Sequence, residues 1–222
     1  MKNITLVIPA KKEAESLPLV LDELKKFDYE ISIVLDRNDF ETINAIKKYN
    51  CNIVYQSGSG YGNAIIEGIN STATEYFCIY NADGSFRPEE ISKMFSLIQQ
   101  NKSDFIFGTR YEKDCGSDDD DIVTSIGNFG FTLLGKIFFK LKLTDILYTF
   151  VLGKTKSAQS LRLKQNDFTF CVELPIKAKK NNMIMETSKS YERSRIAGIK
   201  KVNVLKDGFL ILKHMFILFF KK

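Results

Sequence analysis

The chain has 222 residues, 44% of them hydrophobic, which is enough to bury the core of one domain, alone or with an extension. Its single histidine, His214, argues against a Ser-His-Asp or Cys-His hydrolase and leaves little for a zinc site. The net charge of +5 is unevenly divided, because residues 1–121 carry 13 Lys and Arg against 21 Asp and Glu, whereas residues 122–222 carry 19 against 6. The basic second half favours an anionic partner, either a nucleic acid or a membrane surface, or else it is a well-solvated lysine-rich surface.

The cysteines indicate a reducing compartment. They are far apart and form no CxxC pair: Cys51, Cys78, Cys115 and Cys171. The first apolar run is too short for a signal peptide. We therefore expect a cytoplasmic protein with reduced thiols.

Short apolar runs alternate with helical patterns along the first half of the chain. The runs predict strands at residues 4–10, 31–36, 52–56, 76–80 and 104–110. The segments between them predict helices at residues 13–26, 40–49, 62–70 and 88–100. Alternation at this spacing is typical of an α/β fold with a mainly parallel central sheet flanked by helices.

Polar side chains and glycines follow directly after these runs. They are Pro9 with Ala10, Asp36, the glycine-rich residues 57–62, Asn81 with Asp83, and Arg110. Functional loops of such sheets gather at the carboxyl ends of the strands. The sequence therefore predicts a crevice at this edge that holds a nucleotide.

The second half begins with an acidic segment, residues 112–121, and continues with a helical pattern at residues 126–143. One stripe of this pattern is apolar: Phe131, Leu134, Phe138 and Leu141. With Lys136 and Lys140 off the stripe, the segment predicts either an amphipathic helix at a membrane interface or a helix packed on the core. The apolar tail at 209–222 is shorter than the roughly 20 residues that span a bilayer, so we expect an interfacial or a buried terminal helix.

Seven segments in order resemble the family 2 glycosyltransferases with a Rossmann-like GT-A fold, and among them the dolichyl and polyprenyl phosphate sugar synthases. The segments are VIPAKKEAESL, IVLDRND, GSGYGNAIIEGI, NADGSFRPEEI, FGTRY, LTDILYTFVLGKTKSAQSL and RIAGIKK. They are similar to the family's IPAYNE, VVDDGS, GKGAAVRAGI, DADGSHPPEEI, GSRY, TDxxSGFRAFRREVL and RxxGxSK. The resemblance implies a nucleotide-sugar-binding half at 1–113, an acceptor-side half of the same domain at 114–205, and an apolar C-terminal helix at 206–222.

The resemblance implies an inverting transferase that moves a hexose from a UDP or GDP sugar to a polyprenyl (dolichyl or undecaprenyl) phosphate. It also implies a cofactor, Mg²⁺ or Mn²⁺, which neutralises the charge that builds on the diphosphate leaving group. Asp83 is then the expected metal ligand, assisted by Asn81, which stands where the family usually has Asp. The alternative is that Asp83 only caps the helix that begins near Pro88.

Further roles follow from the same resemblance. The expected nucleotide contacts are Pro9, Ala10, Glu13, Asp36, Gly60, Gly62, Asn81 and Asp83. The glycines allow close backbone approach, and Tyr61 stands between them where relatives often have Lys. The expected ligands of the acceptor phosphate are Arg110, Arg193, Arg195 and Lys201, of which Arg110 and Arg195, with Asp83, are the expected catalytic residues. Arginine binds phosphate bidentately, although each of these side chains has a surface salt bridge as its alternative role.

An ionised acceptor phosphate needs no general base, which suits a chain with one histidine. We therefore expect peripheral association with the cytoplasmic face of a membrane and a role in cell-envelope polysaccharide synthesis. The carboxylates of residues 118–121 would repel a phosphate, so this segment is either a solvated lid loop or a sign that the acceptor is a saccharide or another non-lipid molecule.

Other functions fit the sequence less well. A non-catalytic nucleotide-binding protein is a further alternative because of Asn81 and Tyr61. A sugar nucleotidyltransferase would carry glycines directly after the first strand, which PAKKEAESL lacks. A nucleic-acid partner is not expected, because no aromatic stacking platform accompanies the basic residues. The sequence does not predict the oligomeric state.

Overall fold

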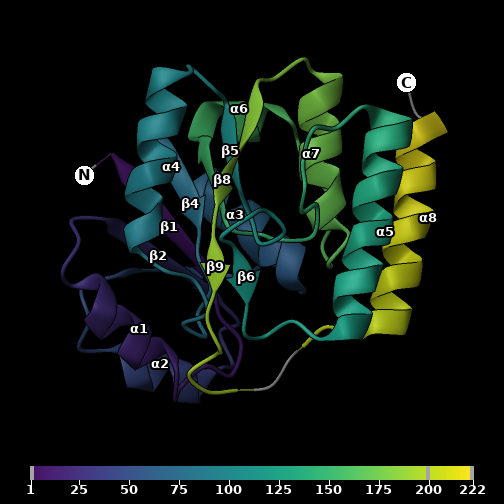
Figure 1. The fold of residues 1–222 in the computed structure, drawn as a ribbon. Helices are drawn as coiled ribbons and strands as arrows, with labels where there is room; N and C mark the ends of the chain where they lie inside the picture. The colour runs from purple at the N-terminus through teal and green to yellow at the C-terminus, as the bar shows by residue number, and fades with distance from the viewer. Residues whose placement is uncertain (1–2, 199–200, 221–222) are drawn as a thin grey trace.

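The computed structural model describes residues 3–198 and 201–220. In this part of the chain, seven strands form one sheet in the order β3-β2-β1-β4-β7-β5-β8 (Figure 1). Their bounds are β1 (Ile4–Pro9), β2 (Glu30–Leu35), β3 (Asn52–Tyr55), β4 (Tyr76–Ile79), β5 (Phe105–Thr109), β7 (Val151–Lys154) and β8 (Met185–Lys189). Neighbouring strands are parallel except for β7, which runs antiparallel to both β4 and β5.

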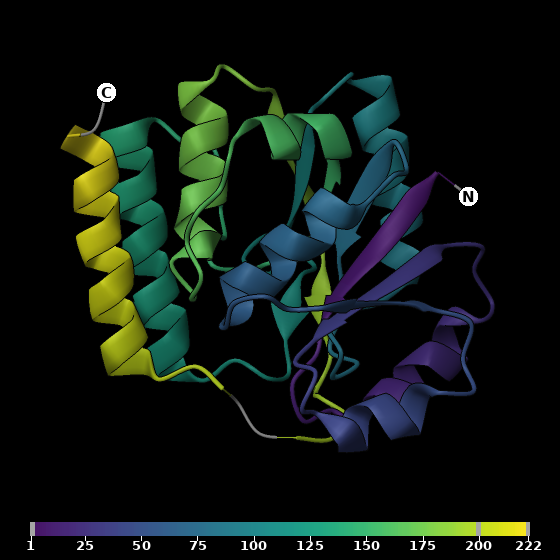
Figure 2. The same cartoon turned by 180° about the vertical axis from the view of Figure 1, so that it is seen from behind.

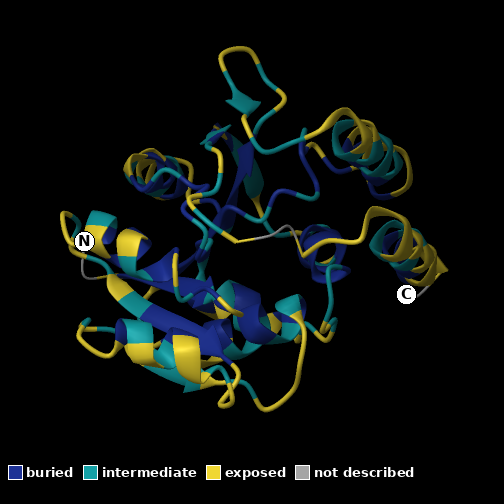
Figure 3. Cartoon of the chain, turned by 90° about the horizontal axis from the view of Figure 1, so that it is seen from below, coloured by how far each residue is buried: buried dark blue, intermediate teal, exposed yellow. Residues whose placement is uncertain are grey.

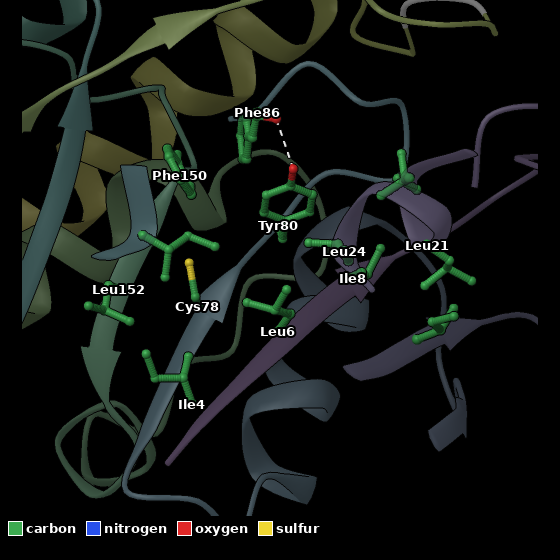
Figure 4. Packing of buried hydrophobic residues seen from close by; sticks show 14 of the residues in the cluster. Ile4, Leu6, Ile8, Leu21, Leu24, Cys78, Tyr80, Phe86, Phe150 and Leu152 are labelled. Carbon is green, nitrogen blue, oxygen red and sulfur yellow. Dashed lines mark hydrogen bonds between the residues drawn. The ribbon is translucent and has the colours of Figure 1, made fainter. Parts of the chain in front are cut away.

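Helices cover both faces of the sheet, which explains why β1, β4 and β5 are almost wholly apolar and buried. One face carries α1 (Leu17–Leu24), α2 (Phe40–Ile46) and α4 (Glu89–Gln100). The other carries α3 (Tyr61–Ser71), α6 (Thr155–Ser160) and α7 (Phe170–Lys180). Side chains alternate accordingly: Leu6 and Ile8 of β1 pack under the first set, beside Tyr80, and Val7 packs under the second (Figure 4).

The predicted fold class is confirmed, as are the types of the elements predicted in the first half. Four of the elements that the patterns did not predict belong to the main body of the second half: β7, β8, α6 and α7. Both strands belong to the same sheet as the first five, so the two halves share one core. A helix at residues 170–180 is hard to read from the sequence because it contains Pro175 and is buried on nearly all sides.

Two long helices, α5 (Ile122–Phe139) and α8 (Val204–Phe220), lie side by side at one edge of the molecule, next to α7 (Figures 1 and 2). They run parallel, because Phe131 contacts Gly208 and Phe139 contacts Phe219. Exposed residues cover the outer surface of this pair, at the right of Figure 3. This pair differs from ordinary core helices, because no layer among the described residues covers its outer apolar surface.

A second, short ladder pairs β6 (Gly116–Ser117) with β9 (Tyr191–Glu192) in parallel. The Asp118 amide extends the ladder by donating to the Glu192 carbonyl at 2.9 Å. This ladder fixes the acidic segment beside the carboxyl end of the main sheet, at the entrance to the site.

Candidate active site

A cleft of about 960 Å³ opens at the carboxyl ends of β1 and β4, where the sequence predicts a nucleotide-binding crevice. Its volume lies at the upper end of the range for small-molecule sites. The lining comes from stretches of the chain that are distant in sequence, chiefly residues 9–16, 56–64, 81–83, 119–120, 192–198 and 201–202, and also from Glu41, Arg110 and residues 147–149 and 168–171. The cleft is therefore a product of the fold and not of one local motif.

Most of the predicted site residues line this cleft. They are Pro9, Ala10, Glu13, Gly60, Asn81, Asp83, Arg110, Arg195 and Lys201. Three others are not among its lining residues: Asp36, Gly62 and Arg193.

The Asn81 and Asp83 side chains are oriented by a turn, because β4 already ends at Ile79. The Ser85 amide donates to Asp83 Oδ1 at 3.0 Å, and Asn81 Nδ2 donates to Ser85 Oγ at 3.2 Å. Gly84 adopts φ +80° in this turn, a conformation that favours glycine. The helix-capping role of Asp83 is excluded, because α4 begins after Pro88 without a side-chain cap.

Asp83 and Asn81 can hold a divalent cation only if a substrate phosphate also coordinates it. The described residues contain no group of three or more His, Cys, Asp or Glu arranged around a metal position. Asp83 and Asn81 offer one carboxylate and one amide oxygen, which are hard ligands of the kind that Mg²⁺ and Mn²⁺ accept. A cation held by so few protein ligands takes the others from substrate phosphates and water.

Arg195 lines the cleft beside the turn that carries Asp83. Its Nε and one terminal nitrogen donate to the two carboxylate oxygens of Asp119 at 3.0 and 2.5 Å, and its other terminal nitrogen lies 4.0 Å from Asp83 Oδ2. These hydrogen bonds to Asp119 raise the pKa of the guanidinium above its usual value. Arg195 therefore joins the acidic segment to the turn that carries Asp83.

Arg110 borders the cleft but its guanidinium is fully engaged by the protein. It donates to Asp145 through Nε and a terminal nitrogen at 2.8 and 3.1 Å, and to Glu192 at 2.7 Å. Burial alone would lower its pKa, but the two carboxylates raise it above the usual value. The Tyr148 ring lies against the guanidinium, 4.4 Å from ring centroid to Cζ. These contacts make Arg110 a link between β5 and β9 rather than an open phosphate ligand.

Arg193 is directed away from the cleft, so the predicted role in acceptor binding does not match its position. It donates to both oxygens of Glu23 at 2.9 and 3.0 Å and to the Phe86 carbonyl at 2.6 Å. It fastens the segment after β9 to α1. Lys201 does reach the cleft, where its ammonium pairs with the Glu13 carboxylate. Ser16 Oγ donates to the second oxygen of Glu13 at 2.7 Å, which orients this carboxylate.

The glycine-rich loop brings Gly60 to the cleft and packs closely against another part of the chain. A Cβ atom on Gly60 would lie 2.2 Å from the Asn166 carbonyl oxygen, and one on Gly62 would lie 2.2 Å from that of Gln165. The backbone that comes close is thus the protein's own, and the Asn63 amide donates to the Asn166 carbonyl at 3.0 Å. Gly62 serves this packing and does not line the cleft.

Tyr61 forms an aromatic wall where the family resemblance led us to look for a lysine. Its hydroxyl hydrogen-bonds Thr149 Oγ1 at 2.7 Å, and its ring stacks on Phe168 with 5.0 Å between centroids. Burial raises the pKa of the phenol well above its usual value, so this group stays neutral. Asp36 lies outside the cleft, exposed, where it accepts a hydrogen bond from the Asn38 amide at 2.8 Å.

Sequence reasoning missed the acidic partners of the arginines. Asp145 belongs to the segment LTDILY that carries part of the family resemblance, so its position was available as a signal. Glu192 and Asp119 had no such signal, because each becomes important only when the β6–β9 ladder brings it to the cleft. The acidic segment is not a freely solvated loop: Asp118, Asp119 and Asp120 all accept hydrogen bonds.

Comparisons with known proteins agree with this geometry. Residues 5–162 match the family model described as glycosyl transferase family 2. An uncharacterized glycosyltransferase of Mycobacterium tuberculosis is 26% identical over 107 residues, which are 48% of each chain, so the match spans about half the length of that relative. The UDP-N-acetylglucosamine–dolichyl-phosphate N-acetylglucosaminyltransferase of Methanococcus voltae is 23% identical over 207 residues and 82% of each chain. The dolichol-phosphate mannosyltransferase of Pyrococcus furiosus is 24% identical over 194 residues, 82% of this chain and 54% of its own.

Solved structures share the fold. Glucosyl-3-phosphoglycerate synthase from Mycobacterium tuberculosis, in complex with Mn²⁺, UDP and glucosyl-3-phosphoglycerate, superposes with a TM-score of 0.77 at 13% identity over 98% of this chain and 80% of its own. Mannosyl-3-phosphoglycerate synthase from Rubrobacter xylanophilus gives 0.68 at 13% identity over 97% and 73%. The predicted GT-A architecture is therefore confirmed, and the chain belongs to glycosyl transferase family 2.

Proposed function

We propose that this enzyme transfers a hexose, with inversion, from a UDP or GDP sugar to the phosphate of a polyprenyl lipid at a membrane surface. The observation that carries the proposal is an apolar surface on α5 and α8 that begins at the cleft. Asp120 and Val202 line the cleft, and α5 and α8 begin two residues after them, at Ile122 and Val204. A lipid chain lying along this surface would present its phosphate at the cleft entrance.

The α5 helix is amphipathic in the opposite sense to a core helix. Its buried side carries polar Asn128, which donates to Asp145, and Thr132, which accepts from the Ile146 amide at 3.2 Å. Its exposed side is a continuous stripe of large apolar residues at helical spacing: Ile122, Ile126, Phe129, Leu133 and Ile137. A surface that is more apolar outside than inside indicates an apolar environment such as lipid.

By length and composition α5 is also the one helix among the described residues that passes as a membrane span. Its polar side is bonded to the rest of the domain, however, and it packs on α7 and α8. These contacts favour a helix lying in the plane of the membrane interface over one crossing the bilayer. In that orientation the exposed stripe from Ile122 to Ile137 would face the lipid. Of the stripe predicted from the sequence, Leu141 is buried and Phe131 and Leu134 are half-buried. Phe138 is 47% exposed, and its ring packs edge-on against Phe219 of α8.

The α8 helix extends the same surface. Its exposed apolar residues include Leu205, which is 87% exposed, and Phe209, Phe216 and Phe220. Exposed lysines stand at the end of α5 and within α8: Lys136, Lys140, Lys206 and Lys213. Apolar side chains combined with lysines suit a membrane with anionic lipids. Electrostatic attraction contributes about 1 kcal/mol of binding free energy for each basic residue near such a surface.

The reaction then uses the cleft residues as follows. An oxygen of the acceptor phosphate, ionised near neutral pH, attacks the anomeric carbon and the bond to the diphosphate breaks, so no general base is needed. A divalent cation, when bound, neutralises charge on the leaving diphosphate, and Asp83 with Asn81 would hold it. Arg195 would bind and orient the acceptor phosphate beside this turn. Glu13, paired with Lys201, would border the nucleoside end.

The substrates of similar proteins support the proposal. Two that cover 82% of this chain act on dolichyl phosphate, and the M. tuberculosis synthase binds Mn²⁺ and UDP. For the cellular location we propose the cytoplasmic face of the membrane, with the product used in cell-envelope polysaccharide synthesis. The free thiols of all four cysteines suit a reducing compartment.

A second candidate is transfer to a hydroxyl acceptor, such as a saccharide. It is favoured by the excess of acid at the acceptor side, where Asp83, Asp119, Asp120 and Glu192 line the cleft with only Arg110 and Arg195. A hydroxyl acceptor needs a general base, which one of these carboxylates would supply. The phosphoglycerate synthases with the same fold act on an acceptor of a non-lipid kind.

The test is transfer of labelled hexose from a panel of UDP and GDP sugars, with Mn²⁺ or Mg²⁺, into a lipid-extractable product. We expect product only when undecaprenyl or dolichyl phosphate is present, with polyprenol as the uncharged control. Transfer into water-soluble saccharides and no transfer into lipid would reject the lipid acceptor and favour the second candidate.

A further inference from the structure

The strongest anion site in the cleft already holds a carboxylate. Arg195 grips Asp119 with two nearly parallel hydrogen bonds of 3.0 and 2.5 Å, the bidentate geometry that a guanidinium also forms with phosphate. Both side chains line the cleft and are about one-fifth exposed, at 22% and 19%. An acceptor that binds Arg195 in this way must first replace Asp119.

Arg195 itself is fixed at this position. The amide of the next residue, Ile196, donates to the Asp83 carbonyl at 2.8 Å, and the free terminal nitrogen of the guanidinium lies 4.0 Å from the Asp83 carboxylate. The backbone thus holds Arg195 beside the turn that would carry the cation. The guanidinium therefore stays within reach of the Asp83 turn when the Asp119 side chain rotates away.

The backbone around Asp119 is also fixed, so only its side chain has to move. The Asp118 amide donates to the Glu192 carbonyl at 2.9 Å, and the Asp119 amide donates to Ser117 Oγ at 3.1 Å. The first contact extends the β6–β9 ladder, and the second closes a turn within the acidic segment. Rotation of one short side chain into the solvent opens the site without unfolding the segment.

We propose that Asp119 is an internal competitor for the acceptor-phosphate position on Arg195 and thereby a specificity-determining residue. A phosphate monoester carries a charge of about −1.5 to −2 at neutral pH, whereas the carboxylate carries −1. The phosphate therefore displaces Asp119 and binds the guanidinium of Arg195. A neutral hydroxyl has no charge to offer Arg195 and leaves the ion pair closed. The inference rests on the proposed function and deepens it, because it gives the acidic segment a role in selecting a phosphate acceptor.

The experiment is a double-mutant cycle on binding of farnesyl phosphate, a soluble short polyprenyl phosphate, measured by calorimetric titration with Mn²⁺ and UDP present. The four proteins are wild type, Asp119→Asn, Arg195→Ala and the double variant. We expect Asp119→Asn to tighten binding about tenfold and Arg195→Ala to weaken it about tenfold or more. The double variant should bind no more tightly than Arg195→Ala, because Asp119 then has no guanidinium to compete for. Farnesol reports binding of the apolar chain alone and should respond to neither change.

Matched controls separate this effect from others. Asp118→Asn removes a neighbouring carboxylate that accepts a hydrogen bond from Tyr191 and does not line the cleft, so farnesyl phosphate affinity should stay within about twofold. Asp119→Ala should repeat the gain, and thermal unfolding verifies that each variant is folded. Inorganic phosphate distinguishes a free anion from a lipid headgroup: a gain for inorganic phosphate without one for farnesyl phosphate would reject the lipid headgroup as the occupant.

Three further results would overturn the inference. Affinity for farnesyl phosphate that is equal in wild type and Asp119→Asn would mean that Asp119 does not compete. If Asp119→Asn still tightened binding in the Arg195→Ala background, Asp119 would act through long-range repulsion of the phosphate and not by competing for Arg195. Loss of transfer in Asp119→Asn at unchanged affinity would identify Asp119 as a base. If wild type glycosylates the lipid in any of these cases, the proposed function stands and the inference alone fails; if wild type neither binds farnesyl phosphate nor glycosylates lipid, both fail.

Discussion

At the scale of single residues, the three arginines near the cleft differ in what their partners leave available. Arg110 has a side chain only 9% exposed and is enclosed by Asp145 and Glu192. Arg193 is bound to Glu23 outside the cleft. Arg195 alone combines a place in the cleft lining with a partner, Asp119, whose side chain can rotate into solvent. The same residue type therefore has a structural role in two positions and a proposed binding role in the third.

Replacing Arg110 with Ala should destabilise the protein. The change would leave the carboxylate of Asp145, whose side chain is fully buried, without its counter-charge, and breaking such a pair costs about 3–5 kcal/mol. Thermal unfolding should show a Tm lower by roughly 6–15 °C. Arg37→Ala is the control, since Arg37 is exposed and its guanidinium lies over the Tyr55 ring at the surface. A Tm shift as large as that of Arg110→Ala would contradict the assignment.

Replacing Asp83 with Ala should abolish transfer and leave the fold intact. The side chain supplies the carboxylate of the proposed cation site, and loss of that contribution lowers the rate on the order of 1,000-fold. The lost hydrogen bond to the Ser85 amide costs only about 1 kcal/mol of unfolding free energy. Asp36→Ala, outside the cleft, is the matched control. Full activity of the Asp83 variant would reject the cation site.

At the scale of elements, α5 reverses the usual distribution of polar and apolar side chains. Its polar contacts face the protein, through Asn128 and Thr132, and its large apolar side chains face outward. The hydrophobic pattern of the sequence shows that the helix is apolar but not which side is covered, because nearly every position is apolar. That distinction depends on Asp145 and α8, which approach from elsewhere in the chain.

The double change Ile126→Asp with Phe129→Asp should abolish membrane binding without loss of stability. Both side chains are exposed, at 67% and 70%, so charge at these positions costs the folded protein little. In co-sedimentation with vesicles containing anionic lipid, the bound fraction should fall at least about tenfold. Leu19→Asp changes an exposed apolar residue on α1, on the other side of the sheet, and should bind as wild type does. Equal binding by all three proteins would remove the support for a membrane role of α5.

At the scale of the whole molecule, the first half of the sheet could be predicted from the sequence and the second half could not. Apolar runs ending in polar residues identified β1 to β5, because strands covered on both faces are continuously apolar. The edge strand β8 lacks such a run, and the apolar residues at β7 do not show that this strand runs antiparallel to its neighbours. The cleft follows the same division: the lining from residues 9–16 and 81–83 was predicted, whereas Glu192 and Asp119 depend on the β6–β9 ladder.

Removal of metal should stop transfer but not unfold the protein, because the described residues contain no metal cluster on which the fold depends. With only Asp83 and Asn81 as protein ligands, Mn²⁺ alone should raise the Tm little, whereas Mn²⁺ with UDP should raise it by several degrees through linked binding. Differential scanning fluorimetry with EDTA, Mn²⁺, UDP and both ligands tests this order. A large shift with Mn²⁺ alone would indicate a preformed site of a different kind.

The outer surface of α5 and α8 also governs how the protein behaves once it is taken out of the cell. In plain buffer nothing but water covers the stripe from Ile122 to Ile137 and the neighbouring Phe209, and copies of the chain can shield these side chains only by associating with one another. An oligomer seen by size exclusion in such a buffer would then report the absence of lipid, and it should dissociate when a mild detergent or a lipid nanodisc takes over the same surface.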